Sequence, residues 1–220
     1  MTIDILTLFP ESFSYFNTSI LKRAQESGKL KINLIDIRQF SKDKHKKCDD
    51  YPFGGGAGML MTAQPIFDAI KSVQKENSHI IFASPSGKTL SAEKGKELSQ
   101  YDHLIFICGH YEGIDQRILD IFKPEEISIG DYVLTGGELA SMVIIDCLSR
   151  FVDGVITKES LNEESFSNGG LEYPQYTRPQ VFEGLEVPQV LVSGNHQEIE
   201  KWRKEESLKK TKQIRPDLIK

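Results

Sequence analysis

Short apolar runs and longer amphipathic stretches follow one another through the first 156 residues of the chain. Apolar runs of four to eight residues are typical of buried strands, and apolar residues recurring every three or four positions are typical of helices. The pattern predicts strands at Ile3–Phe9, Leu30–Ile37, His79–Ala83, His103–Cys108 and Ile127–Ile129. It predicts helices at Glu11–Ser27, Ala63–Val73, Ser91–Ser99, Ile114–Ile121 and Glu138–Arg150. Strands that alternate with helices indicate an α/β domain with a largely parallel sheet.

The pattern changes after Ile156. The segment 157–178 is polar, rich in Gly, Ser and Asn, and without a period, which is typical of a linker. Beyond it, Asn195 followed by Glu198 forms a capping pattern, so we expect a final helix to about Lys210. We therefore expect an α/β domain, a flexible linker and a small helical domain at 1–156, 157–178 and 179–220.

Composition excludes several classes of protein. The chain has 220 residues, with 27 Lys and Arg against 32 Asp and Glu, so a uniformly basic nucleic-acid-binding protein is excluded, although a local basic patch is not. Three widely spaced cysteines without a C-x-x-C pattern argue against a disulfide scaffold or a thiolate zinc site. The segment Met1–Pro10 has no basic region before its apolar run, and no uncharged apolar run approaches the length of a membrane span. We expect a cytoplasmic protein without a signal peptide.

Three glycine-bearing turns follow predicted strands, at 84–87, 109–113 and 129–137. In open α/β sheets, ligands bind outside the carboxyl ends of the strands, and glycine lets the backbone approach a ligand closely. The common nucleotide motifs do not fit. Gly87-Lys88-Thr89 matches the end of a P-loop, but Phe82 occupies the position of its first glycine, and no G-x-G-x-x-G follows the first strand. The turns therefore predict a ligand pocket of another kind.

A set of motifs spread along the whole chain closely resembles bacterial tRNA (guanine-N1)-methyltransferases, which belong to the SPOUT superfamily. The long-loop motif Asp49–Met61 contains the run Gly-Gly-Gly-Ala-Gly. The other motifs are Gly109–Asp115, Ser128–Leu139, Ser149–Phe151, Tyr176–Pro179 and Val192–His196.

This resemblance implies an α/β domain with a C-terminal trefoil knot, followed by a small helical domain that binds tRNA. It implies a homodimer with each active site at the subunit interface, and transfer of methyl from S-adenosylmethionine to N1 of guanine 37 in tRNA. Two alternatives remain open at this stage. One is a catalytically weak or inactive homologue that only binds tRNA, and the other is a SPOUT methyltransferase that acts on another RNA.

The resemblance also assigns binding residues. The residues expected to bind S-adenosylmethionine are Gly109, Ile129, Gly130, Asp131, Tyr132, Val133, Leu134, Gly136 and Gly137, with Ser84, Pro85 and Tyr111 nearby. Those expected to bind tRNA are Gly55, Gly56, Met59, Glu112, Arg178 and Glu172. The family is reported to use Mg²⁺, but no set of metal ligands is legible in this sequence.

Methylation of guanine N1 needs a base, because N1 carries a proton at neutral pH, and positive charge near O6, where electron density builds. Arg150 matches the catalytic arginine of the family. Glu164 stands where the family usually has Asp before Ser-Phe, so we expect Glu164 to be the general base, with Glu163 as its nearest rival. His110 stands where Arg is frequent, and we assign it no role.

RNA binding needs local positive charge despite the acidic total. The stretch Arg38–Gly58 has no clear period, and we call it the long loop. It supplies a basic run, Arg38, Lys42, Lys44, His45, Lys46 and Lys47. The C-terminal tail is also rich in Lys and Arg, but interleaved Glu residues fit a solvated charged helix equally well. Trp202 is expected to be a packing anchor. The chain stops four residues after Pro216, so we expect a shortened C-terminal domain.

Overall fold

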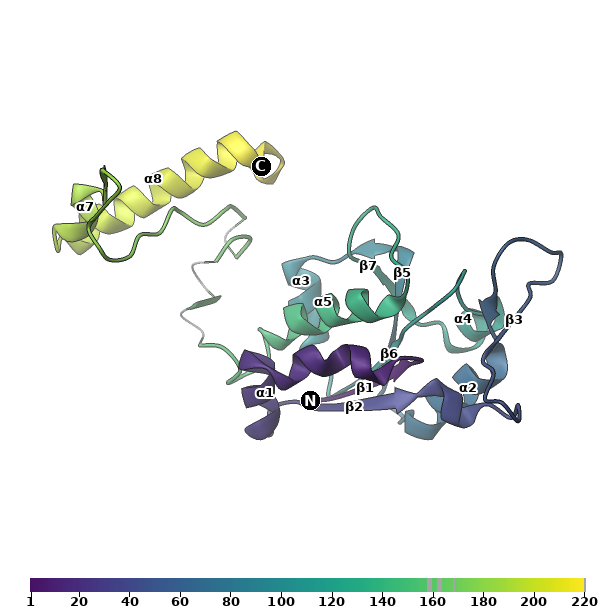
Figure 1. Ribbon diagram of the computed structural model, residues 1–220. Helices are drawn as coiled ribbons and strands as arrows, with labels where there is room; N and C mark the ends of the chain where they lie inside the picture. Colours follow the sequence, from purple (N-terminus) through teal and green to yellow (C-terminus); the bar gives the residue numbers. More distant parts are fainter. Residues whose placement is uncertain (158–159, 162–163, 168, 220) are drawn as a thin grey trace. The chain divides into compact units, whose positions relative to one another are not determined.

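The computed structural model describes residues 1–157, 160–161, 164–167 and 169–219 (Figure 1). The chain divides into two compact units, Met1–Ile156 and Thr157–Lys220. We describe each unit by itself.

The first unit is built on a five-stranded, fully parallel sheet (Figure 1). Its strands are β1 (Thr2–Thr7), β2 (Lys31–Asp36), β5 (His79–Thr89), β6 (His103–Ile107) and β7 (Glu125–Ser128). Their order across the sheet is β2-β1-β6-β5-β7. The predicted α/β class with a parallel sheet is confirmed.

Helices cover both faces of this sheet, and each face has its own apolar core. The five helices are α1 (Ser19–Glu26), α2 (Ala63–Val73), α3 (Ala92–Leu98), α4 (Gln116–Phe122) and α5 (Gly137–Ser149). Along β6, Leu104 and Phe106 pack with α1, α3 and α5, whereas Ile105 and Ile107 pack with α2 and α4. Successive side chains of a strand point to opposite faces, so a continuous apolar run supplies both cores. As expected, Ser91 caps α3, its Oγ accepting from the Lys94 N–H at 3.2 Å.

The single helix predicted at Glu11–Ser27 is wrong. A 3₁₀ helix, η1 (Pro10–Asn17), ends at Thr18, which has extended backbone angles, and α1 begins after it. Phe13 has non-helical backbone angles, so η1 is itself kinked at this residue, and Phe13 and Phe16 are both buried in the core.

The strand predicted to end at Ala83 instead continues to Thr89 as β5. The prediction that the turn at 84–87 ends this strand is therefore wrong. The pairing of β5 with β7 shifts register between Ala83 and Lys88, which marks an irregularity inside the strand. A Cβ on Gly87 would lie 2.4 Å from the Glu126 carbonyl carbon, so only glycine fits this close approach.

The long aperiodic loop holds small regular elements that the sequence pattern did not predict. They are a 3₁₀ helix, η2 (Ile37–Phe40), and a short antiparallel ribbon of β3 (Asp49–Asp50) and β4 (Leu60–Met61). This ribbon brings the two ends of the glycine-rich segment together. The other predicted boundaries in the first unit agree with the structure to within two residues.

The second unit contains a long helix preceded by short elements (Figure 1). The short elements are a hairpin of β8 (Val181–Phe182) and β9 (Leu185–Glu186), then α7 (Gln189–Val192). The long helix is α8 (His196–Ile214), and η3 (Pro216–Leu218) follows it. The predicted cap of α8 is confirmed, because the Asn195 side-chain oxygen accepts from the Glu198 N–H at 3.4 Å. The helix runs four residues beyond the expected end at Lys210. Among the residues that the structure describes, no helix combines the length and apolar character needed to cross a bilayer.

Candidate active site

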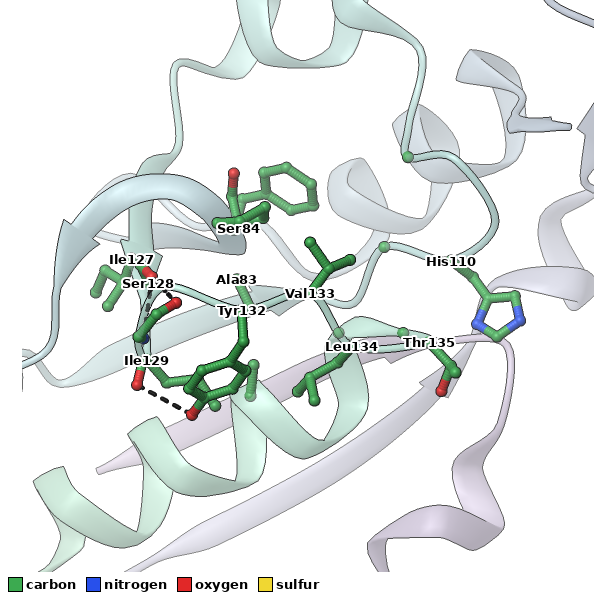
Figure 2. Close-up of a pocket in the computed structure, with 18 of the residues that line it drawn as sticks. Ala83, Ser84, His110, Ile127, Ser128, Ile129, Tyr132, Val133, Leu134 and Thr135 are labelled. Atoms are coloured by element: carbon green, nitrogen blue, oxygen red, sulfur yellow. Dashed lines mark hydrogen bonds between the residues drawn. The ribbon is translucent and has the colours of Figure 1, made fainter. Parts of the chain in front are cut away.

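A hollow lies at the carboxyl edge of the sheet, where residues 82–85 of β5 meet the segments that follow β6 and β7 (Figure 2). These three strands are neighbours in the sheet, so their carboxyl ends converge although the segments are far apart in sequence. The backbone N–H of Gly137 donates to the Gly109 carbonyl at 2.7 Å, and an isolated β-bridge pairs His110 with Gly136. The hollow has a volume of about 160 Å³.

The loop after β7 is held by its own side chains, as Figure 2 shows. Ser128 Oγ accepts from the Gly130 N–H at 3.1 Å, and the Tyr132 hydroxyl donates to the Ile129 carbonyl at 3.1 Å. Gly130 has φ +146°, and its missing side chain leaves room for the Tyr132 ring. The loop is therefore a shaped wall of the hollow.

All the residues that the sequence assigned to the methyl donor line this hollow, except Asp131. The structure adds lining residues that sequence reasoning missed, chiefly Phe82, Ala83, Ile127, Thr135 and Ala140. Four of these are apolar, and three of the four come from the neighbouring strands β5 and β7, whose pairing in the assembled sheet brings them to one hollow.

The lining of the hollow suits a flat, cationic ligand. Its walls are mostly backbone and apolar side chains, and Glu112 is the one acidic residue among the described residues that line it. The Nδ1 atom of His110 is buried without a hydrogen-bond partner there. A positively charged ligand would meet no Lys or Arg in this lining.

The glycine-rich loop reaches the same hollow through Glu112. The Glu112 N–H donates to the Met59 carbonyl at 3.0 Å, and a Cβ on Gly58 would lie 2.5 Å from Glu112 Cγ. Two of the residues predicted to bind tRNA, Met59 and Glu112, are thus brought to the hollow. Gly55 and Gly56 instead lie on the exposed part of the loop, both with positive φ.

Arg150 does not line this hollow. It lies at the end of α5 and lines a second hollow of about 830 Å³ on the outer side of that helix. The two hollows share the side chains of Ile129, Tyr132 and Leu134. The two hollows therefore adjoin at these shared residues, whereas Arg150 lies at the carboxyl end of α5, opposite the end where Gly137 and Ala140 line the donor hollow.

The outer hollow is apolar and open. Leu139 and Val143 of α5 are 57% and 47% exposed, although the opposite face of the helix is buried in the core. At its edge the Tyr15 hydroxyl donates to Asp146 Oδ2 at 2.7 Å, and this hydrogen bond, with the charge of Asp146, raises the pKa of Tyr15. Such an exposed apolar face is typical of an interaction surface.

The remaining predicted residues belong to the second unit. Glu164 and Glu172 line a separate hollow beside α8, and the Glu172 carboxylate accepts a hydrogen bond from Gln175 Nε2. Arg178 is exposed and precedes a cis peptide bond to Pro179. Glu163, the rival base, lies outside the described residues.

In the part of the chain that the structure describes, no group of three His, Cys, Asp or Glu side chains could hold a metal ion.

Lysines of both basic regions form ion pairs with carboxylates. In the long loop, Lys42 and Lys47 make ion pairs with Asp68 and Asp50 at 3.4 and 3.9 Å, both exposed to solvent. In α8, lysines pair with glutamates three or four residues away, which fits the solvated-helix interpretation of that region. The Trp202 ring lies 6.4 Å from the Tyr176 ring, which favours its packing role.

Comparison with known proteins bears on what this site does. The model of the family described as tRNA (Guanine-1)-methyltransferase TrmD matches residues 1–220. The chain belongs to this family. A protein of Caldicellulosiruptor saccharolyticus named tRNA (guanine-N(1)-)-methyltransferase is 58% identical over 221 residues, which cover 100% of this chain and 90% of the relative. Proteins with the same name from Clostridium botulinum strain Kyoto and Clostridium perfringens strain SM101 are also 58% identical, with 92% and 93% of their chains covered. The family resemblance found in the sequence motifs is confirmed over the full length.

Proposed function

We propose that this protein transfers a methyl group from S-adenosylmethionine to N1 of guanine 37 in tRNA. The observation that carries this proposal is the meeting of three glycine-bearing segments around a nearly neutral hollow, in a chain whose whole length matches the tRNA guanine-1 methyltransferase family. The relatives named above are tRNA (guanine-N1)-methyltransferases by name, and the position in the tRNA is our own inference.

The residues of the hollow fit the donor. S-adenosylmethionine supplies an electrophilic methyl group on a sulfonium sulfur when it is bound. Backbone groups of Ile129–Leu134 would hydrogen-bond the edge of its adenine, and the apolar side chains of Ile129 and Leu134 would pack on the ring. Glu112 is suited to face the positive charge, because it is the carboxylate in the lining.

The reaction needs a proton acceptor and a positive charge at the guanine. We assign Glu164 as the general base that takes the N1 proton. We assign Arg150 to O6, where its guanidinium would stabilise the negative charge that develops as N1 loses its proton. Glu172 and Arg178 would contact the tRNA in the same unit as Glu164.

We further propose a homodimer with the active site at the subunit interface. The exposed apolar face of α5 supports this proposal, because it is the face that carries Arg150 and adjoins the donor hollow. We also propose a trefoil knot in the C-terminal part of the first unit, because the family resemblance implies one.

A radioactive methyl-transfer assay tests the function. The purified protein and S-adenosylmethionine labelled in the methyl group are mixed with an unmodified tRNA transcript carrying G36-G37, or with the same transcript carrying a G37→A change. We expect transfer to the first transcript only, with the label at guanine N1. Transfer to ribose or to another RNA would support the alternative of a different SPOUT activity. Tight tRNA binding without transfer would support the inactive homologue.

Single-turnover rates test the two catalytic assignments. We expect Arg150→Ala and Glu164→Gln to slow transfer by about 100-fold or more, the range for loss of a general base or a charge stabiliser. Glu164→Asp should retain most of the rate, because it keeps the carboxylate. If Glu163→Gln is slow and Glu164→Gln is not, the base is Glu163. A mixture of the inactive Arg150 and Glu164 variants should regain activity if the two residues meet across the interface.

A further inference from the structure

The linker segment that follows Glu164 is fastened to α8 by two hydroxyl side chains. Thr211 Oγ1 accepts from the Leu171 N–H at 2.9 Å and donates to the Ser207 carbonyl at 2.7 Å. Ser207 Oγ donates to the Leu171 carbonyl at 2.6 Å. Both backbone polar groups of Leu171 are therefore satisfied by side chains one helical turn apart.

Neighbouring contacts tighten this attachment. Thr211 is the buried residue of α8, with 2% of its surface exposed, although the helix is otherwise highly polar. A Cβ on Gly170 would lie 3.2 Å from Thr211 Oγ1, so glycine permits the close approach. Lys210 Nζ donates to the Glu172 carbonyl at 3.1 Å. We call Ser207 and Thr211, with the Leu171 groups they bind, the hydroxyl clamp.

The turn that carries Glu164 is tied to the clamped segment by backbone bonds. The Ser167 N–H donates to the Glu164 carbonyl at 3.2 Å, and the Phe166 N–H donates to the Gly170 carbonyl at 2.7 Å. The Glu172 N–H donates to Ser165 Oγ at 3.0 Å. A continuous set of hydrogen bonds thus runs from Glu164 to Thr211 within one unit.

Phe166 shows that this turn is held rather than free. Its φ of +76° is in the left-handed region, which is strained for an aromatic residue and persists only where the surroundings fix it. The Arg215 guanidinium lies 5.9 Å from the centre of the Phe166 ring, a cation–π contact from the residue just after α8. The turn is therefore held by α8 on one side and by the residue beyond its end on the other.

We propose that Thr211 and Ser207 are positioning residues for the reaction, which hold the turn bearing Glu164 on α8 so that the base is delivered as part of the tRNA-binding unit. This inference rests on the proposed function, because it takes Glu164 as the base. Ordering a polar linker is opposed by the loss of conformational entropy, and the hydrogen bonds of the hydroxyl clamp offset part of this cost before the tRNA arrives. Small errors in the placement of a catalytic group can slow a reaction about 100-fold.

Variants at position 211 separate positioning from general folding. Thr211→Val keeps the shape and removes the hydroxyl, and Thr211→Ser keeps the hydroxyl and removes a methyl group. We expect single-turnover transfer at saturating tRNA to fall about tenfold or more in Thr211→Val and in Ser207→Ala, with tRNA affinity changed by less than about threefold. Thr211→Ser should restore most of the rate. Ser193→Ala is the matched control, because the Ser193 hydroxyl belongs to the same unit and, among the described residues, bonds to Val190 and Asn195 in the turn before α8.

Hydrogen exchange gives a second readout that needs no activity. The amide of Leu171 should exchange at least about tenfold faster in Thr211→Val than in the wild type, whereas the Ser193→Ala variant should leave it unchanged. If the exchange rate does not rise, or if the single-turnover rate stays at the wild-type level, the clamp does not position the base. A loss confined to tRNA affinity, or an equal loss in Thr211→Ser and Thr211→Val, also overturns the proposal.

The two readouts distinguish this proposal from the function on which it rests. If the wild-type protein does not methylate tRNA under any of the assay conditions, the proposed function fails. If it methylates tRNA and Thr211→Val loses amide protection without losing rate, the function stands and the positioning role is wrong.

Discussion

The backbone N–H of Gly137 donates to the Gly109 carbonyl at 2.7 Å, which joins the start of α5 to the turn after β6. A Cβ on Gly137 would lie 2.8 Å from the Gly109 nitrogen and 3.0 Å from Cys108 Cα. Both neighbours are backbone atoms in the middle of the fold, so neither can move aside easily. Both residues line the donor hollow, so this contact holds two parts of its wall together.

Gly137→Ala should therefore weaken binding of S-adenosylmethionine by at least about tenfold and lower the free energy of unfolding by about 1–3 kcal/mol, the range for overpacking in a close-packed interior. Isothermal titration and urea unfolding measure the two effects. Gly28→Ala is a control for instability alone, because Gly28 has φ +73° with no atom near its missing side chain and lies after α1. It should lose stability without losing donor affinity, and unchanged affinity in Gly137→Ala would contradict the role assigned to this contact.

A buried pair links β1 to α5 beneath the same hollow. Thr7 Oγ1 donates to Glu138 Oε1 at 2.8 Å, and the two residues are 0% and 7% exposed. Removing this donor from a buried carboxylate should lower the free energy of unfolding by about 1–3 kcal/mol. Thr7→Val tests this by urea unfolding, with Thr89→Val as an exposed control on β5 that should change stability by less than about 0.5 kcal/mol. A neutral Thr7→Val variant would mean that Glu138 is satisfied without Thr7.

Stability at acid pH should depend on Glu125 of β7. Burial raises the pKa of its carboxyl, but Lys94 at 2.7 Å and His79 at 2.7 Å lower that pKa more, so the net shift is downward from the ordinary value of 4.5. A carboxyl whose pKa is lower in the folded state stabilises the fold above its unfolded pKa, and the contribution is lost as pH falls through the folded pKa.

Glu125→Gln should therefore reduce stability by about 1 kcal/mol near pH 7, where the wild-type carboxylate is paired, and the difference should shrink below about pH 4. Melting temperatures of the wild type and of Glu125→Gln, measured from pH 7 to below about pH 4, check the prediction. A difference between the two proteins that does not change with pH would show that the carboxylate charge is not what matters.

The proposed dimer makes a prediction for the exposed face of α5. Val143→Glu places a charge on that face and should convert the protein to a monomer with strongly reduced methyl transfer, because a charge in the core of an interface is unfavourable without a partner. Sedimentation equilibrium measures the mass. Ile121→Glu on α4 is the matched control, since Ile121 is also an exposed apolar helix residue, with 58% of its surface exposed. A wild-type protein that sediments as a monomer, or a Val143→Glu variant that stays dimeric, would contradict the proposal.

Local sequence features were sufficient to predict the class of fold and most of the segments that form the donor hollow. Apolar runs bounded by glycine marked the strands, Ser91 and Asn195 marked two helix starts, and the turns at 109–113 and 129–137 marked the edge where a ligand would bind. These features depend on residues close together in the chain, so the sequence pattern reveals them. The break at Thr18 and the irregularity at Gly87 were missed, because burial of Phe13 and Phe16 and contact with Glu126 override the local preference.

The sequence by itself determined that this protein is an α/β chain with a ligand edge, and its motifs placed it among the tRNA guanine-N1 methyltransferases. Only the tertiary structure decided the order of the strands, the contact between Gly109 and Gly137, the position of Arg150 on the outer side of α5, and the attachment of the Leu171 backbone to Thr211. Each of these joins residues that are distant in the chain or depends on which face of an element is buried. Such pairings follow from the packing of the whole unit, which no single segment encodes.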